Sequence, residues 1–535
     1  MKRRNLFLSL ICSLILTVAL VTVTVINLVP KKNNGTTGSQ PSTNVSDPVT
    51  DEKPDVTVNE DRDGSAEKPY VIYSAETFQT FVVDKYLDEK GEYIDYTKVD
   101  EQGKLLHPEL NAGLHYELDA DIDFADVEFS TIFNKGVAFN GHINGNGHIV
   151  KNISIEVLKD NLVNDFTAVV DGELVANIGV FGDLNGAEIK NITFENISVD
   201  LEDGLYDYVW SANFETKNGT MNAIAVGSLA GVVNNSTIEA NVTATIDAFA
   251  YSVYVENRAD GLFAVGGVAA SVENSTIANA KVDVDMIVNQ GTNYFVGGVV
   301  GSAFDSKIEK VEVKAEILTH YEDALYIGGS VGYAIGLNMS EVNVDLTVSE
   351  IEAQRYNAYG ISSIDNTKFV SVAGAVHTIN INNTASTVKE VSVYANVDVD
   401  GIYAGAVMDV VNGTDGLLVE LSNIVVESNV NVLKVYGFAR KLNNTKVDLS
   451  KTIPVYDEET KEEYAYNIKL NGKVNLESYN GDEEDMYTAS IYVLENNNCQ
   501  FVGGRKAVKV VTTADILNNT RLIEKNAKIW GLLKF

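Results

Sequence analysis

The stretch VGGVAASVENSTI (265–277) returns as VGGVVGSAFDSKI (296–308) and again as IGGSVGYAIGLNM (327–339). The copies start 31 residues apart each time. Related segments start at Ile178, Val226, Val372 and Tyr403. A fixed period of this length is typical of stacked supersecondary units, each of which packs on its neighbours.

The run that follows each glycine segment alternates apolar and polar residues. In VEVKAEI, the residues Val311, Val313, Ala315 and Ile317 alternate with Glu312, Lys314 and Glu316. A shift of 31 residues gives the same alternation around Val282 and around Val344. A period of two indicates strands with one buried and one solvated face. The sequence therefore predicts parallel strands in register, with Val282, Val313 and Val344 in one apolar ladder.

These observations predict an all-β fold, a right-handed parallel β-helix (β-solenoid) with terminal caps. The recurring pairs Gly266-Gly267, Gly297-Gly298 and Gly328-Gly329 indicate that another piece of backbone approaches closely. The positions of Asn235, Asn274, Asp305 and Gly336 hold residues that tolerate left-handed turns, and they predict the coil corners.

The segment FNGHINGNGHIV (139–150) predicts turns and short strands where the chain enters its first coils. His142 and His148 suggest a metal site, but neither a cysteine nor a third histidine lies nearby in the sequence. No helix is expected after the glycines, which disfavours a phosphate loop. The acidic stretch ELDADIDF (117–124) lacks the glycine and the glutamate of a calcium loop. We therefore expect no metal and no cofactor.

The chain divides into five regions by composition. Residues 1–29 contain an uncharged apolar run, 6–29, long enough to span a bilayer. It predicts an uncleaved signal anchor, with a cleaved signal peptide as the alternative, so the rest of the chain is expected outside the plasma membrane. Residues 30–69 read as a disordered tether, 70–138 as an N-terminal cap with leading strands, 139–450 as the repeat solenoid, and 451–535 as a C-terminal cap.

The net charge of −35 disfavours nucleic acid as a partner, because the same field repels phosphate backbones. Cys12 and Cys499 are the two cysteines in the sequence, and Cys12 lies in the apolar run. We therefore expect no disulfide within the folded region.

Several segments resemble the GLUG-motif β-helical surface proteins of bacteria: GSAEKPYVIYSAETF (64–78), LDADIDF (118–124), FNGHINGNGHIVKNISI (139–155), IGVFGDLNGAEIKNITF (178–194) and VGGVVGSAFDSKIEKVEV (296–313). The resemblance covers residues 64–450. It implies a surface-tethered solenoid of adhesin type. Some relatives precede immunoglobulin A peptidase domains, but the signature His-Glu-x-x-His does not occur in this chain. The family carries no settled catalytic residues, so none is transferred.

We expect binding without catalysis. A glycan-processing β-helix enzyme (lyase or hydrolase) is one alternative and a passive surface spacer is another. Residues 139–450 contain three arginines that share no motif, which disfavours lyase chemistry. The predicted binding residues are aromatic, in excursions that leave the coil at one phase: Tyr206, Tyr208, Trp210, Phe214, Tyr251 and Tyr254. The expected partner is a host or environmental glycan or protein.

Overall fold

The computed structural model describes residues 59–510 with internal gaps, of which the longest are 206–220, 249–261, 351–369 and 475–484. Residues 1–55 form one unit and residues 56–535 a second, which contains all the described residues. Within the described residues, no helix is long and apolar enough to cross a membrane. Residues 6–29, the expected anchor, lie outside them.

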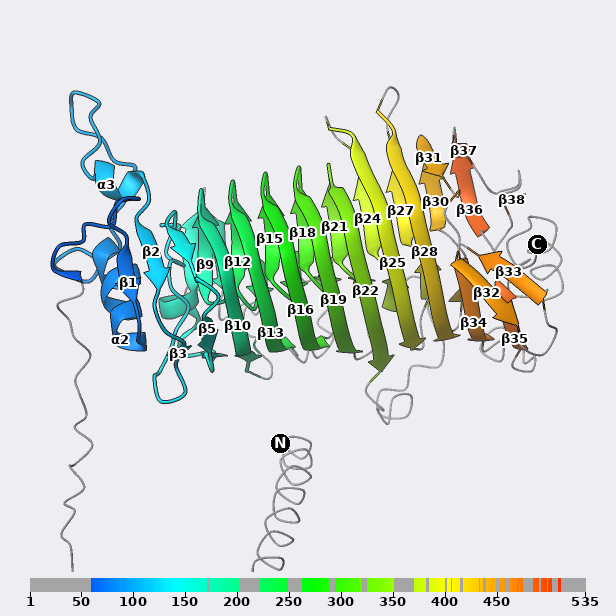
Figure 1. Ribbon diagram of the computed structural model, residues 1–535, viewed down its shortest axis with the longest axis horizontal. Helices are drawn as coiled ribbons and strands as arrows, with labels where there is room; N and C mark the ends of the chain where they lie inside the picture. Colours follow the sequence, from blue (N-terminus) through cyan, green and yellow to red (C-terminus); the bar gives the residue numbers. More distant parts are fainter. Residues whose placement is uncertain are drawn as a thin grey trace, which may run out of the picture. The chain divides into compact units, whose positions relative to one another are not determined.

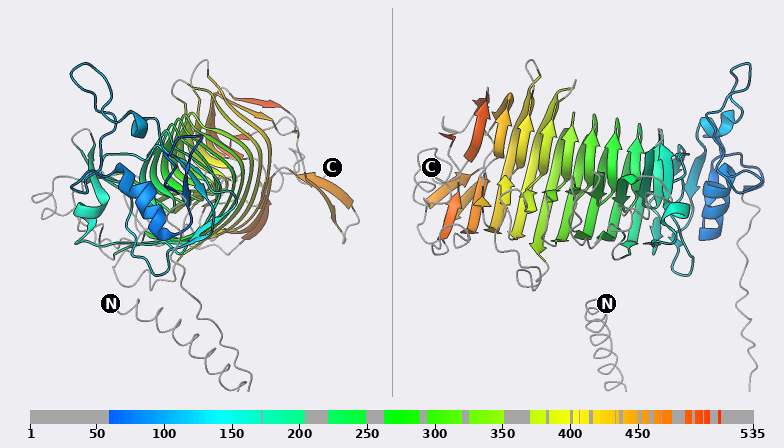
Figure 2. Two further views of the ribbon diagram at one scale, coloured as in Figure 1. Left: turned by 60° about the vertical axis from the view of Figure 1, so that its left-hand side comes forward. Right: turned by 180° about the vertical axis from the view of Figure 1, so that it is seen from behind.

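The second unit is a parallel β-solenoid, as predicted. Its strands form sheets of 17, 9 and 10 strands, and they follow one another along the stack in chain order (Figure 1). Seen from a different angle, successive coils nest behind one another (Figure 2). The long strands of the 17-stranded sheet are β10 (Glu188–Leu201), β13 (Thr237–Ala248), β16 (Thr276–Val288), β19 (Lys307–Thr319), β22 (Asn338–Glu350), β25 (Ser386–Asp398) and β28 (Val419–Val432).

Each coil also contains two short strands, one in each smaller sheet. The first set is β8 (Glu173–Ile178), β11 (Met221–Gly227), β14 (Leu262–Gly266), β17 (Tyr294–Gly297), β20 (Leu325–Gly328), β23 (Val370–Ala373) and β26 (Ile402–Gly405). The second set is β9 (Phe181–Asn185), β12 (Ala230–Asn234), β15 (Ala269–Glu273), β18 (Val300–Phe304), β21 (Val331–Ile335), β24 (Val376–Asn380) and β27 (Met408–Asn412).

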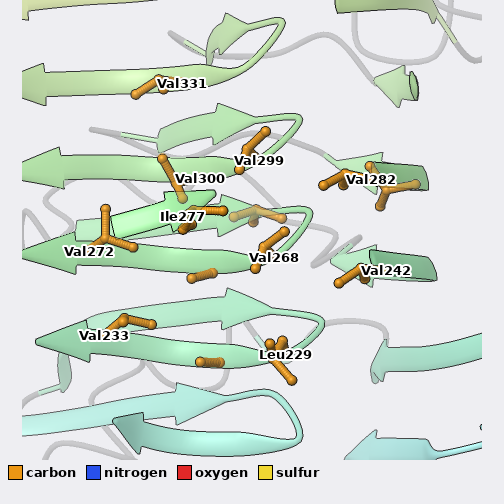
Figure 3. Close-up of a cluster of buried hydrophobic side chains, with 14 of the residues drawn as sticks. Leu229, Val233, Val242, Val268, Val272, Ile277, Val282, Val299, Val300 and Val331 are labelled. Atoms are coloured by element: carbon orange, nitrogen blue, oxygen red, sulfur yellow. The ribbon is translucent and has the colours of Figure 1, made fainter. Parts of the chain in front are cut away.

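The register of the long strands confirms the 31-residue ladder. Val282 pairs with Val313, and Val313 pairs with Val344, all in parallel. All three side chains are at most 3% exposed. Figure 3 shows how side chains of the long strands, such as Val242 and Val282, of the short strands, such as Val272, and of the turns between short strands, such as Val268, together fill the interior. One face of each strand is buried in this continuous core.

The glycine pairs lie where backbone approaches closely, as expected: the first glycine of each pair meets its own coil and the second meets the next coil. A Cβ on Gly267 would overlap the carbonyl oxygen of Gly298, and one on Gly298 would overlap that of Gly329. A side chain at either position would therefore separate the coils.

The predicted corner residues adopt left-handed conformations: Asn235 (φ 48°), Asn274 (φ 48°), Asp305 (φ 45°) and Gly336 (φ 73°). The serine after each non-glycine corner residue continues the ladder through its hydroxyl. Ser236 donates its N–H to Ser275 Oγ, and Ser275 donates its N–H to Ser306 Oγ, each over 3.1 Å. Backbone groups that leave the sheet at the corner are thus still satisfied.

The N-terminal region covers the first coil. β1 (Tyr70–Ile72) precedes α2 (Ala75–Phe78), whose N-cap is Ser74. ELDADIDF (117–124) does not form one continuous strand. It contains the end of β2 (His115–Leu118) and β3 (Ile122–Asp123), separated by Asp119–Asp121. The carboxylate of Asp121 accepts a hydrogen bond from the backbone N–H of Ile149.

Parallel pairing continues after the sequence repeat fades at Ser450. β34 (Ile468–Val474) pairs with β28, and β37 (Gln500–Val502) pairs with β31 (Thr445–Asp448). A hairpin of β32 (Ile453–Asp457) and β33 (Glu462–Tyr466) lies between β31 and β34 in the chain. Residues 511–535, expected to close the solenoid end, lie outside the described residues.

Candidate functional site

Six of the seven long strands contain a bulge that shapes their outer face. The bulge residue has φ between 51° and 56° and no partner in the strand register: Asn191, Asn279, Lys310, Glu341, Glu390 and Asn423. The exception is β13, which has no such residue, so the register between it and its neighbours shifts. An extra residue in one strand bends it and increases its local twist. From β16 to β28 the bulge recurs at the same place in each coil, so the bends line up along this part of the solenoid.

A hollow of about 780 Å³ lies on the outer face just after these bulges. It crosses six long strands, β13, β16, β19, β22, β25 and β28. Because parallel strands lie about 4.8 Å apart, the hollow extends about 24 Å along the solenoid. We call it the central hollow; its lining is residues 241–243, 281–283, 312–314, 343–345 and 392–394, with Val425 and Glu427.

Two further hollows adjoin the central one, because they share lining residues with it. The first, of about 520 Å³, shares Asn241 and is lined by Asn146, Gly147, Asn191, Ile192, Thr193, Glu239 and Asn279. The second, of about 530 Å³, shares Glu312 and Asn343 and is lined by Lys310, Val311, Glu341, Glu390 and Asn423. We call these the amide-lined hollow and the acidic hollow, and all three together the trough. The bulge residues line both adjoining hollows, so the bulges build the trough.

The charges in the central hollow are largely paired across coils. Lys281 Nζ lies 2.8 Å from a carboxylate oxygen of Glu312, and Lys314 Nζ lies 3.1 Å from one of Asp283. The hydrogen bonds with Asp283 and Glu316 raise the pKa of Lys314. Such exposed pairs contribute at most about 1 kcal/mol to stability. Their main effect is to neutralise both lysines of the central hollow, whose lining also holds the carboxylates of Asp345 and Glu427.

Tyr394 is the exposed aromatic residue of the trough lining. It is 49% exposed and lies on β25, in the central hollow. Its hydroxyl accepts a hydrogen bond from Asn429 Nδ2 over 3.4 Å. A large, half-exposed ring among polar side chains is a suitable contact for a ligand with both apolar and polar groups.

The six predicted binding residues, Tyr206, Tyr208, Trp210, Phe214, Tyr251 and Tyr254, all lie outside the described residues. The segments that hold them connect a long strand to the next short strand, as expected from their phase in the repeat. The sequence analysis did not find the trough. One signal was available for Tyr394, because it occupies an outward, polar position of its strand's alternation.

The two histidines of FNGHINGNGHIV do not come together. His142 lies in β4 (His142–Asn144), where its ring stacks on His115 with centroids 4.4 Å apart, and its Nδ1 lies 3.5 Å from Glu188. His148 instead contacts Asp121. Burial and the neighbouring His142 lower the pKa of His115. The described residues contain no group of three or more His, Cys, Asp or Glu side chains able to hold a metal ion.

A second polar cluster contains a serine, a histidine and an aspartate. His377 Nε2 lies 2.8 Å from Ser371 Oγ and 3.4 Å from Asp409 Oδ2, and each of the three residues is at most 2% exposed. In a hydrolytic triad the serine and the acid contact different ring nitrogens, and the serine is open to substrate. Here both contact Nε2 and the hydroxyl is buried. The arrangement is that of a buried polar cluster that pairs adjacent coils.

Asp183, on β9, gives the fold a pH dependence. Burial raises its pKa to about 6, although Asn177 Nδ2 donates a hydrogen bond to it over 2.6 Å. The ordinary pKa of an aspartate side chain is 3.8. The folded state therefore holds a proton that the unfolded state has lost between these values, and stability falls as the pH rises through about 6.

We expect Asp183→Asn to raise the free energy of unfolding by about 1–2 kcal/mol at pH 8, because no half-buried carboxylate then has to ionise. Well below pH 3.8 the aspartate is neutral in both states, and the variant should match the wild type. Thermal unfolding at about pH 2.5, 6 and 8 measures this. An equal change in melting temperature at all three values would contradict it.

Comparison with known proteins gives distant structural neighbours. No protein-family model and no curated protein matches the chain. One similar solved structure is an IgA1 protease, with 11% identity and a TM-score of 0.36; the match covers 77% of this chain and 24% of that protein's chain. Another, from Bacteroides ovatus and provisionally described as an immunoglobulin A1 protease, has 12% identity and a TM-score of 0.33, with 83% and 87% covered.

The expectation that the chain is not an enzyme is corrected by these neighbours, since both are described as proteases. At such TM-scores the likeness carries no argument about which reaction, if any, this chain performs. No protease residue is therefore assigned to it.

Proposed function

We propose that the chain is a surface solenoid of adhesin type that binds an extended ligand in the trough. The observation that carries the proposal is the continuity of the three hollows, which share lining residues along the outer face of the 17-stranded sheet. A long, open groove with both polar and apolar surface fits an extended molecule better than a compact one. The resemblance of residues 64–450 to GLUG-motif surface proteins supports the same role, with a host or environmental glycan or protein as the partner.

The trough variant Asn343→Trp tests the proposal. Asn343 is an exposed residue in the middle of the trough, shared by the central and acidic hollows, so an indole there would occupy the groove. We expect attachment of the purified protein to its target cells to weaken at least tenfold. The matched control is Asn396→Trp, an exposed asparagine on β25 outside the lining, which should bind as the wild type does.

The predicted aromatic residues remain a second candidate surface. In the same assay, replacing Tyr206, Tyr208 and Trp210 together by alanine tests them, because a few aromatic residues usually dominate such contacts. If this triple variant loses attachment and Asn343→Trp does not, the excursion binds the ligand and the trough does not. Circular dichroism and melting temperature verify that each variant is folded.

We further propose that residues 6–29 tether the solenoid to the plasma membrane, with the solenoid outside. The uncharged run and the preceding Lys2, Arg3 and Arg4 support this orientation. We expect the protein to stay with membranes after a high-salt wash, and surface proteolysis to release a fragment that starts within residues 30–69. Recovery of mature protein from the medium, starting just after the apolar run, would contradict the tether and favour a cleaved signal peptide.

A further inference from the structure

The trough offers side chains but no open strand edge. Outside the bulge residues, the N–H and C=O groups of the long strands pair with the coils before and after them. A polypeptide that binds by adding a strand needs an unpaired sheet edge. A ligand on this face must therefore be recognised mainly by side chains.

The lining side chains are rich in groups that both donate and accept hydrogen bonds. Asn241, Asn279, Asn343 and Asn423 contribute amides, and Thr243 and Ser392 contribute hydroxyls. A sugar hydroxyl is likewise a donor and an acceptor, so it pairs with such groups in either direction. These side chains come from five of the six long strands that the central hollow crosses, all but β19, which suits an elongated ligand.

The charge of the lining selects against polyanions. It contains seven carboxylates and three lysines, and two of the lysines are paired with Glu312 and Asp283. The whole chain carries a net charge of −35. Phosphate, sulfate or uronate polymers would therefore be repelled.

The amide-lined hollow disfavours the opposite case, a basic polypeptide. Its one carboxylate, Glu239, already accepts a hydrogen bond from Asn279 Nδ2 over 3.0 Å. This end of the trough thus offers hydrogen bonds and little charge, whereas a run of lysines or arginines would need an acidic surface along its length.

We propose that the trough binds a neutral, linear polysaccharide that lies along the solenoid axis, with its hydroxyl groups on the amides and carboxylates of successive coils and one sugar ring on Tyr394. The proposal rests on the proposed function and specifies its ligand. Tyr394 supplies the apolar surface that the carbon–hydrogen face of a sugar ring requires.

Calorimetric titration of the purified full-length protein tests the ligand class. The probes are neutral hexasaccharides of β-linked glucose, xylose and mannose, the anionic hexasaccharide of galacturonic acid, and oligolysine. We expect at least one neutral oligosaccharide to bind and the galacturonate to give no heat of binding. Tyr394→Ala should lower the affinity for the neutral oligosaccharide on the order of tenfold, a loss of about 1.4 kcal/mol in binding free energy. Leu106→Ala removes a 52% exposed apolar side chain far along the chain from the trough, and it should change nothing.

The outcomes separate this inference from the proposed function. If oligolysine binds, and Asn343→Trp abolishes that binding while no neutral oligosaccharide binds, the trough is a binding site but its ligand is a basic polypeptide. If galacturonate binds best, the charge argument is wrong. If Asn343→Trp still attaches to target cells as the wild type does, the proposed function itself fails, whatever the oligosaccharides do.

Discussion

Replacing Val313 by aspartate should destabilise the solenoid by about 3 kcal/mol or more, because it places a carboxylate between two valines in a dry ladder. Val313 is 3% exposed and pairs with Val282 and Val344. A lowered midpoint of urea unfolding, together with new proteolytic cleavage near β19, measures the effect.

The matched control is Asn396→Asp, which introduces the same acid on the opposite face of the same sheet. Asn396 is exposed and pairs with Thr347 and Asn429, neither of which is charged. We expect a change within about 0.5 kcal/mol. Equal destabilisation by the two variants would mean that the faces of the sheet are assigned wrongly.

Gly298→Ala should be comparably damaging, although it adds a single methyl group. The new Cβ would overlap the carbonyl oxygen of Gly329 and lie 2.8 Å from Val313 Cγ1. Backbone of the next coil cannot move aside without shifting its own ladder, so we expect a loss of about 3 kcal/mol or a local separation of the coils. Hydrogen exchange of the amides in β17 and β20 would locate the separation.

Gly186→Ala is the comparison for this substitution. Gly186 has a positive φ of 78°, but its Cβ would meet nothing within 4 Å. Gly186→Ala should lower the free energy of unfolding by about 1 kcal/mol, the ordinary cost of an alanine in a left-handed conformation. If Gly298→Ala costs no more than Gly186→Ala, the close approach between coils does not explain the glycine pairs.

The coil interior was predictable because it depends on local alternation. Val282, Val313 and Val344 follow a spacing that can be read from the sequence, and the corners at Asn235 and Asn274 carry residues with a known preference for left-handed turns. The sequence also favours glycine wherever backbones meet. In each case the residue type indicates directly whether the position is buried, lies in a left-handed turn or meets other backbone.

The trough was not predictable in the same way. Three of the bulges that build it occur at Lys310, Glu341 and Glu390, which have no preference for a left-handed conformation. From β16 to β28 each bulge lies beside a bulge in the next strand, so the ladder stays in register on both sides of it. The alternation continues through the bulge with one extra residue, and that residue has the same polar character as the outer face.

The stacking of whole coils also determines how such a protein can change over evolutionary time. One coil uses 31 residues to advance the stack by one strand spacing, about 4.8 Å, whereas the same residues fully extended would span roughly 100 Å. A duplicated or deleted coil preserves every remaining ladder, but an insertion of any other length inside a strand does not. The trough can therefore be lengthened or shortened by one coil at a time, and the remaining contacts with a repeating ligand are inherited unchanged.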